Sequence, residues 1–158
     1  MNGIMTDKEV YERYGQPNNW KDYVKFYPPF QMYLAWNLTQ KINFFYCHKF
    51  IHPMLTQAFD HLLECYSDEG IHDLGIDLYG GCFNYRLMRG STTRLSRHSW
   101  GIAIDMHPSM NKLSWGSDKA VFAEDDYKDM MNAFYQAGFI NYGVEKDRDY
   151  MHFEPKRI

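Results

Sequence analysis

The sequence predicts an α+β fold formed by a single domain over residues 1–158. Three observations lead to this prediction. A chain of 158 residues has the usual size of one compact domain. Apolar residues make up 45% of the chain and aromatic residues 18%, which excludes a disordered protein. Helical spacing of apolar residues occurs early and late in the chain, with short strand-like runs between.

Three helices are expected, at about residues 7–14, 53–70 and 125–137. Thr6 opens a capping-box pattern for the first helix, and Gly15 is its stop signal. Pro53 suits the first turn of the second helix, and Asp68-Glu69-Gly70 is expected to end it. The third helix has acidic residues in its first turn, where the helix dipole favours them, and Gly138 closes it.

Five runs have the composition of strands: residues 42–46, 76–79, 83–87, 101–107 and 150–154. Residues 16–30 are rich in Pro, Asn and aromatic residues, and we expect an ordered arm wrapped on the domain. The expected organisation is therefore an N-terminal helix and arm over 1–30 and core motifs over 76–158.

Charge and hydropathy exclude several classes of protein. With 17 Lys plus Arg against 20 Asp plus Glu, the net charge of −3 argues against a general nucleic-acid binder. No stretch approaches the roughly 20 apolar residues that a membrane-spanning helix needs, so no membrane insertion is expected. The N-terminus lacks the basic start and apolar segment of a secretory signal, which predicts cytoplasmic synthesis. The three cysteines are expected to be free thiols.

Reactive side chains concentrate in two segments near the end of the chain. In a strand over 101–107, side-chain alternation puts Asp105 on the face opposite Ile104 and Met106. The flexible Gly101 lets His98 fold back toward Asp105, and His152 is expected on the last strand. Two imidazoles and one carboxylate suit Zn²⁺ and leave a fourth position for water.

Neighbouring charges extend this pattern toward catalysis. Asp149, three residues before His152, is placed to take a proton from water and pass it to a leaving amine. Four arginines and no acid occur between Arg86 and Arg97, a local positive charge suited to an oxyanion and an anionic substrate. The same ligand types also occur in iron(II) oxygenases, but those enzymes need a jelly roll that this pattern does not offer.

Several other histidines and cysteines have simpler interpretations. His107 is expected to end its strand before Pro108 rather than bind a metal. Cys82 lies near the site, but no His or Asn arrangement supports a nucleophile, so a buried thiol is expected. The Cys47-His48 pair with His52 lacks a fourth ligand and is interpreted as a core cysteine and a helix-start histidine.

The two segments resemble the motifs of a known family. Residues 96–105 read Ser-Arg-His-Ser-Trp-Gly-Ile-Ala-Ile-Asp and match Ser-x-His-x-x-Gly-x-Ala-x-Asp, and residues 149–152 add an acid three residues before a final His. This pattern resembles the zinc D-Ala-D-Ala carboxypeptidase and L-alanyl-D-glutamate peptidase family. That family includes bacterial cell-wall enzymes and phage endolysins and shares a fold with the hedgehog signalling domain. The resemblance covers residues 80–154 well and the first 75 residues only in general arrangement.

The resemblance implies a small antiparallel sheet that carries a zinc site between flanking helices. The implied zinc ligands are His98, Asp105 and His152. It further implies Asp149 as the general base and Arg86 as the group facing the scissile carbonyl or its oxyanion, a role for which Arg89 competes. The expected substrate contacts are Ser96, Arg89, Trp100 and Tyr150, and Trp100 either walls the cleft or packs in the core.

The function implied by the resemblance is a zinc metallopeptidase that hydrolyses peptidoglycan stem peptides, as a D-Ala-D-Ala carboxypeptidase or an L-Ala-D-Glu endopeptidase. The alternative is a non-catalytic, zinc-containing cell-wall-binding module of the same fold. Family members often carry Gly-Gly-x-Trp before the last motif, whereas residues 141–148 here read Asn-Tyr-Gly-Val-Glu-Lys-Asp-Arg, which leaves the specificity open. Without a signal segment, a phage-encoded enzyme is expected, released through a holin or carried in the virion.

Overall fold

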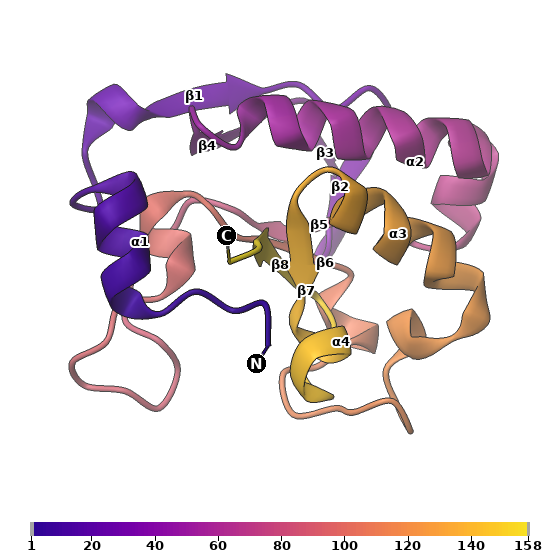
Figure 1. Cartoon of the computed structure of the whole chain (residues 1–158). Coiled ribbons are helices and arrows are strands. Elements are labelled where there is room, and N and C mark those ends of the chain that lie inside the picture. The colour runs from indigo at the N-terminus through magenta and orange to yellow at the C-terminus, as the bar shows by residue number, and fades with distance from the viewer. Residues whose placement is uncertain (1, 158) are drawn as a thin grey trace.

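The expected α+β class is confirmed by a computed structural model that describes residues 2–157 (Figure 1). A six-stranded sheet has the order β3-β2-β5-β6-β8-β7. Its strands are β2 (Met32–Leu34), β3 (Asn37–Ile42), β5 (Leu78–Gly81), β6 (Ile104–Met106), β7 (Phe139–Asn141) and β8 (His152–Pro155). A separate two-stranded ribbon pairs β1 (Tyr23–Phe26) with β4 (Phe45–His48).

The six-stranded sheet is not purely antiparallel, which corrects the expectation. β2 and β5 run parallel, while the other neighbouring strands are antiparallel. Parallel neighbours need a long crossover connection, and the helix α2 (His52–Asp73) lies on the path between β2 and β5. After β3 the chain thus leaves the sheet, adds β4 to the ribbon, forms α2 and returns as β5 in the direction of β2.

Local capping signals set the bounds of α1 (Asp7–Tyr14), as predicted. The Oγ1 of Thr6 accepts a hydrogen bond from the backbone N–H of Glu9 at 3.2 Å. Gly15 follows with a φ of 73°, a left-handed conformation that glycine adopts at little cost. The third expected helix is α3 (Lys128–Gln136), preceded by a 3-10 turn over Asp125–Tyr127.

The second helix runs beyond its expected end. Ser67 breaks the helical backbone with a φ of 63°, but helical structure resumes and carries α2 on to Asp73. The prediction that Asp68-Glu69-Gly70 ends the second helix is therefore wrong. Ile71 is only 1% exposed, and its burial in the core explains why the chain continues as a helix after the break.

Several expected strands are displaced. The run at 42–46 spans the turn between β3 and β4, and residues 83–87 form only an isolated bridge between Leu87 and Leu95. The arm at 16–30 contains β1, and the helix α4 (Tyr142–Lys146) was not predicted. These segments are short, so tertiary pairing rather than local composition decides their structure.

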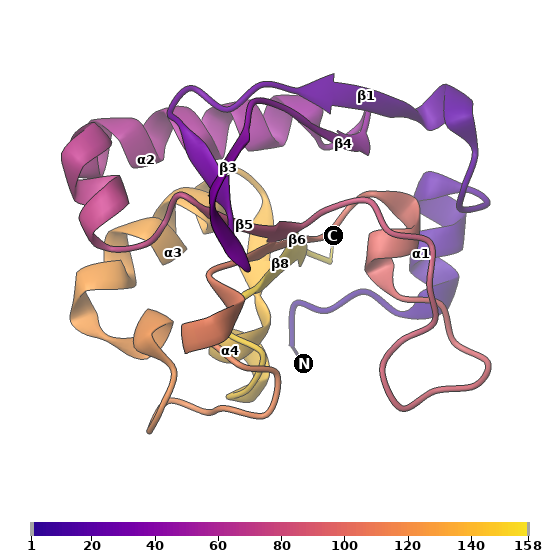
Figure 2. The same ribbon diagram turned by 180° about the vertical axis from the view of Figure 1, so that it is seen from behind.

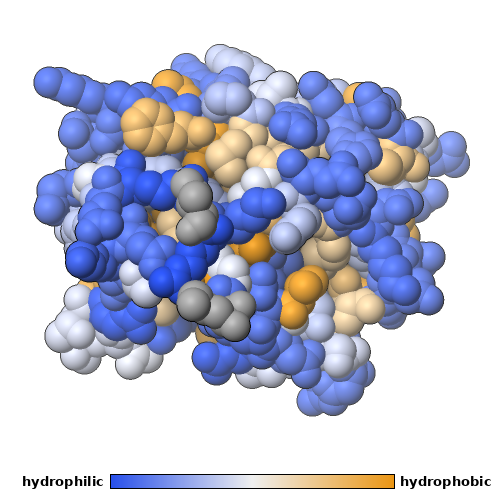
Figure 3. Space-filling model, in the orientation of Figure 1, coloured by the Kyte–Doolittle hydropathy of each residue, from blue (hydrophilic) through white to orange (hydrophobic). Residues whose placement is uncertain are grey.

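Aromatic residues fill the core between the sheet and the helices α2 and α3, which pack against each other (Figures 1 and 2). Phe134 of α3 stacks on Phe153 of β8, with ring centroids 4.0 Å apart. In the view of Figure 3 most of the surface is hydrophilic, and the apolar side chains form separate small groups. Within residues 2–157, no helix has both the length and the apolar character needed to cross a lipid bilayer.

An ion-pair cluster joins α1 to the middle of the chain. Asp7 accepts hydrogen bonds from Arg94 Nε at 2.8 Å and from Arg97 Nη1 at 2.7 Å. Arg97 is buried, and its Nη2 also donates to the carbonyl oxygen of Met5 at 2.7 Å. These contacts fix the N-terminal helix beside the turn that carries His98.

Replacing Asp7 by Asn tests this attachment. At pH 7 we expect a loss of about 1 kcal/mol of unfolding free energy, kept small because solvent screens a partly exposed carboxylate. The hydrogen bond from Arg94, helped by Arg97, lowers the pKa of Asp7 from 3.8 to about 2 against the effect of burial. The stabilisation is therefore full above pH 3.8 and is lost as the pH falls toward 2. Urea unfolding should show the gap between the two proteins narrowing from pH 5 to pH 3, and a constant gap would contradict the prediction.

Candidate metal centre

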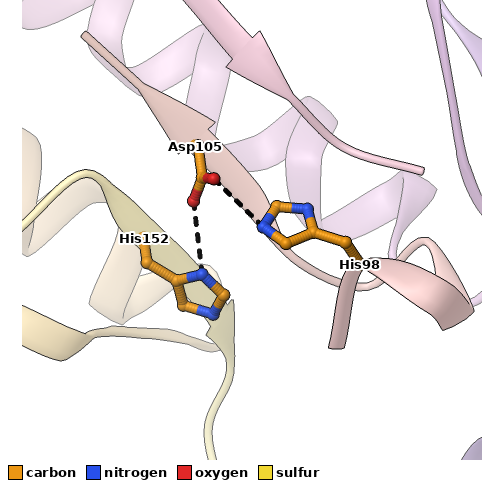
Figure 4. A group of neighbouring side chains, drawn as sticks. All are labelled: His98, Asp105 and His152. Carbon is orange, nitrogen blue, oxygen red and sulfur yellow. Dashed lines mark ion pairs between the residues drawn. The ribbon is translucent and has the colours of Figure 1, made fainter. Parts of the chain in front are cut away.

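Three side chains converge where β6 and β8 meet the 3-10 turn η2 (Arg97–Trp100), as Figure 4 shows. Asp105 and His152 are register partners on β6 and β8, and His98 lies in η2. Asp105 Oδ2 lies 3.1 Å from His98 Nε2, and Asp105 Oδ1 lies 3.2 Å from His152 Nδ1. One ligand atom from each residue lies within 4.8 Å of the others, so the group can hold a metal ion.

The local sequence explains how His98 reaches Asp105. Ser96 caps the turn η2, and its Oγ accepts a hydrogen bond from the backbone N–H of His98 at 3.2 Å. Gly101 ends the turn with a φ of 68°, which reverses the chain into β6. Ile104 and Met106 are fully buried on the core side of β6, as side-chain alternation predicted, and Asp105 faces the pocket.

Each imidazole is oriented by a second contact on its far nitrogen. His98 Nδ1 donates to the carbonyl oxygen of Cys82 at 2.7 Å, since a carbonyl can only accept. This leaves the lone pair of His98 Nε2 directed at the centre. His152 Nε2 lies 2.8 Å from Glu154 Oε1 and donates to it, which leaves His152 Nδ1 for a metal ion. Such contacts fix the tautomer and orientation of metal-binding histidines.

The charges of the group are mutually dependent. Burial alone would raise the pKa of Asp105, but the two imidazoles hold it well below its usual range. Burial alone would lower the pKa of His152, but the carboxylates of Asp105 and Glu154 beside it raise it.

The residues present fit a divalent metal ion. His98 Nε2 and Asp105 Oδ1 are buried and have no hydrogen-bond partner, although both point toward the centre. Buried polar atoms without partners are costly, and a cation between them would remove that cost. Two imidazole nitrogens and a carboxylate oxygen are a donor set that Zn²⁺ accepts.

Asp149 lies beside this group without belonging to it. It is 8% exposed, and its Oδ1 has no hydrogen-bond partner. Desolvation by burial raises the pKa of Asp149, and the negative charge of Asp105 adds to the effect while His152 opposes it. A carboxylate with a raised pKa at the edge of a metal-binding group is suited to accept and return a proton.

Glu154 was not singled out in the sequence as a site residue. It is fully buried, and besides its contact with His152 its Oε2 lies 3.6 Å from Arg97 Nε. Arg97 in turn binds Asp7, so a continuous chain of polar contacts runs from α1 to His152. An acid two residues after the histidine of a strand shares its face, and that spacing is the signal that predicts the contact.

The three side chains and Asp149 line a pocket of about 180 Å³. Of the expected substrate contacts and oxyanion groups, the pocket walls include Arg86, Arg89 and Ser96. Lys146 and Arg148 also line it, and the sequence had not pointed to them.

Two expected wall residues lie elsewhere. Trp100 is 2% exposed, and its Nε1 donates to the carbonyl oxygen of Gly15 at 2.8 Å, so this ring packs against α1. The hydroxyl of Tyr150 donates to Asp147 Oδ1 at 3.2 Å, and neither aromatic ring is part of the pocket lining. Of the two alternatives for Trp100, core packing is therefore confirmed, and the expectation that Tyr150 walls the cleft is corrected. Trp100 lies two residues after His98 and Tyr150 directly follows Asp149, but neither side chain lines the pocket.

The expected arginine cluster is also divided. Arg94 and Arg97 are both paired with Asp7; Arg94 lies outside the pocket lining, whereas Arg86, Arg89 and the buried Arg97 are part of it. The sequence could not show this because the neutralising acid lies about 90 residues earlier. His107 directly follows β6 and precedes Pro108; it lies outside the metal-binding group, as expected, and the thiol of Cys82 is buried.

The comparisons with known proteins agree with the motifs. Residues 89–155 match the family model described as D-alanyl-D-alanine carboxypeptidase. The match covers less than half of the chain and supports the zinc D-alanyl-D-alanine carboxypeptidase family that the two motifs resemble. Comparison with curated proteins and with solved structures gave no match. The carboxypeptidase-family segment contains the metal-binding group and Asp149, whereas α1 and Arg86 lie before it.

The contact between Glu154 and His152 can be tested by replacing Glu154 with Gln. We expect the affinity for a divalent ion, with Zn²⁺ as the probe, to fall about 10- to 100-fold, because the imidazole loses its charged orienting partner. Competition with a coloured chelator measures the affinity, and circular dichroism checks that the variant folds. The exposed Glu124→Gln is the matched control and should bind as tightly as the unmodified protein. Equal affinity in a folded Glu154 variant would contradict the assignment.

Proposed function

We propose that the protein is a zinc metallopeptidase that hydrolyses peptide bonds in peptidoglycan stem peptides, of the D-Ala-D-Ala carboxypeptidase or L-Ala-D-Glu endopeptidase type. The observation that carries this proposal is the metal-binding group of His98, Asp105 and His152 in one pocket with the unpartnered carboxylate of Asp149. The family match over residues 89–155 supports the peptidase class. The cationic residues of the pocket suit a substrate with free carboxylates.

The ligands of the ion would be His98 Nε2, a carboxylate oxygen of Asp105 and His152 Nδ1. Zn²⁺ in such a site polarises a carbonyl group and lowers the pKa of a water molecule to about 7. Asp149 then accepts the proton of the attacking water and passes it to the leaving amine. Its burial in the pocket keeps bulk water from competing for that proton.

The role we propose for Arg86, which lines the pocket, is to donate hydrogen bonds to the oxyanion that forms at the scissile carbonyl. Its backbone carbonyl accepts from Ser96 N at 2.9 Å and from Ser99 Oγ at 2.8 Å. Arg86 is thereby attached to the same turn that carries His98, whereas Arg89 lies in the exposed part of the loop. A donor held in a fixed position relative to the metal centre stabilises developing charge without reorganisation.

Asp149→Asn tests the catalytic role directly. We expect the zinc-loaded variant to lose about 10²- to 10⁴-fold in kcat, because the amide cannot accept a proton, while its zinc content stays at one per chain. The assay is the release of amino groups from purified peptidoglycan, and mass spectrometry of the products identifies the bond. The exposed Asp118→Asn is the control. If Asp149→Asn releases amino groups as fast as the unmodified protein, the proposed catalytic role is wrong. If the unmodified protein binds zinc and cell wall but releases no amino groups, a non-catalytic wall-binding module is favoured.

Substitutions of Arg86 and Arg89 should have different effects on kcat and KM. Arg86→Lys is expected to lower kcat about 10- to 100-fold with little change in KM, because a donor to the oxyanion acts only in the transition state. Arg89→Lys is expected to change KM more than kcat. Steady-state assays on a synthetic stem peptide measure both, and the reverse pattern would assign the oxyanion role to Arg89.

We further propose that the enzyme is phage-encoded and reaches the wall through a holin or in the virion. The support is analogy with the phage endolysins of the family that its motifs resemble. Clearing of permeabilised bacteria by the added zinc-loaded protein is the expected result. No clearing by a protein that cleaves isolated peptides would contradict a lytic role.

A further inference from the structure

The ribbon formed by β1 and β4 has one face in the core and one face in solvent. Lys25 of β1 is the register partner of Tyr46 of β4, and both side chains are exposed. The next pair, Phe26 with Phe45, is buried, and Phe26 packs on Phe59 of α2 with ring centroids 5.1 Å apart. Side chains alternate along each strand, so Lys25 and Tyr46 point away from the core. Figures 1 and 2 show the ribbon at an edge of the molecule, beside α2.

Four aromatic rings follow one another along the outer face, and we call them the aromatic row. The ring centroids of Trp20 and Tyr46 lie 6.2 Å apart, those of Tyr46 and Phe44 5.9 Å, and those of Phe44 and Tyr27 5.7 Å. Their exposed fractions run from 37% for Tyr46 to 74% for Trp20. The Nζ of Lys25 lies 4.5 Å from the centroid of Phe44, so a cationic group belongs to the same surface.

This arrangement departs from the usual pattern of an antiparallel ribbon. When one face of such a ribbon packs on the core, the other face normally carries polar side chains. Contacts between neighbouring rings stabilise the ribbon, but they leave much of the outward ring surface in water. A cluster of exposed rings that the fold does not cover is typical of a binding surface.

The composition of the row indicates the chemistry of its ligand. Within residues 20–27 and 44–46, all of which the structure describes, the exposed apolar side chains are aromatic, and the aliphatic Val24 packs against the core. Polar groups lie at the ring edges: the indole N–H of Trp20 and the hydroxyls of Tyr27 and Tyr46. A sugar ring matches this pattern, because its C–H groups lie on the ring faces and its hydroxyls at the edge. An acyl chain has no polar edge for these groups to meet.

The ribbon is attached to the turn that carries the metal-binding histidine. The backbone N–H of His48 donates to the carbonyl oxygen of Gly101 at 2.8 Å. The hydroxyl of Tyr23 donates to the carbonyl oxygen of Ser99, within η2, at 3.1 Å. The aromatic row is therefore held in a fixed position relative to His98, although none of its rings lines the pocket.

We propose that the aromatic row binds the sugar rings of a cell-wall glycan strand, as a second binding surface separate from the pocket. The choice of this glycan rests on the proposed function, because the stem peptides of the wall are joined to glycan strands. Sugar rings stack on Trp20 and Tyr46, and Lys25 donates hydrogen bonds to their oxygen atoms. The row thereby holds the enzyme on the polymer that carries its substrate.

Peptide-free glycan strands, prepared from peptidoglycan by removal of the stem peptides, test this binding. In calorimetric titration we expect Trp20→Ala to raise the Kd of the strands about 10-fold, the effect of losing one well-packed ring. Trp36→Ala is the matched control, because Trp36 is 70% exposed and lies outside the row, and it should bind as the unmodified protein does. Circular dichroism checks that both variants fold. Zinc-loaded Trp20→Ala should release amino groups from a short synthetic stem peptide at the unmodified rate.

The outcomes separate this inference from the proposed function. If the unmodified protein does not bind the glycan strands, or if folded Trp20→Ala binds them with unchanged Kd, the inference is wrong and the peptidase assignment stands. Binding to vesicles of phosphatidylglycerol and phosphatidylethanolamine in place of the strands, or a dimer that Trp20→Ala dissociates in analytical ultracentrifugation, would also overturn it. Glycan binding that depends on Trp20, in a protein that releases no amino groups from any stem peptide, would support the inference and contradict the proposed function.

Discussion

The site depends on one buried charge, the carboxylate of Asp105 between His98 and His152. An isolated carboxylate at this depth would be costly, and the two imidazoles beside Asp105 offset part of that cost by favouring its ionised form. The arrangement requires β6 and β8 to pair in the register that sets Asp105 beside His152, and it requires the turn η2 to fold back over β6. The pairing of β6 with β8 therefore does two things. It joins two neighbouring strands of the sheet, and it brings together two of the three residues of the metal-binding group.

The contacts behind the imidazoles extend this dependence to the N-terminus. His152 is held by Glu154, Glu154 lies beside Arg97, and Arg97 is paired with Asp7 of α1. The family match begins at residue 89, so α1 lies before the matched segment and yet contacts the residues that support the site. Figures 1 and 2 both show α1 beside the turn η2, which agrees with these contacts. Through the buried Arg97, the polar network joins parts of the chain that are about 150 residues apart in sequence.

The sequence predicted correctly those features that depend on interactions between residues close together in the chain. Thr6 and Gly15 bounded α1 correctly, because capping involves only neighbouring residues. The spacing within the two motifs predicted which three side chains come together, because a short turn and a strand constrain each motif. The predictions that proved wrong concern side chains whose positions depend on contacts with distant parts of the chain. Nothing local indicates that Arg94 pairs with an acid 87 residues away, or that the indole of Trp100 turns toward α1. The cationic pair near α4 was missed because α4 itself was not predicted.

The proposal that His98, Asp105 and His152 bind a metal ion is tested most directly by X-ray absorption of the zinc-loaded protein. Zinc should bind with one ion per chain and show nitrogen and oxygen neighbours at about 2.0–2.2 Å, with the scattering pattern of two imidazoles. The signal should disappear when His152 is replaced by Ala. A sulfur neighbour at about 2.3 Å would instead place the ion at a cysteine, and an unchanged spectrum in the His152→Ala variant would place it elsewhere. Either result would contradict the central claim.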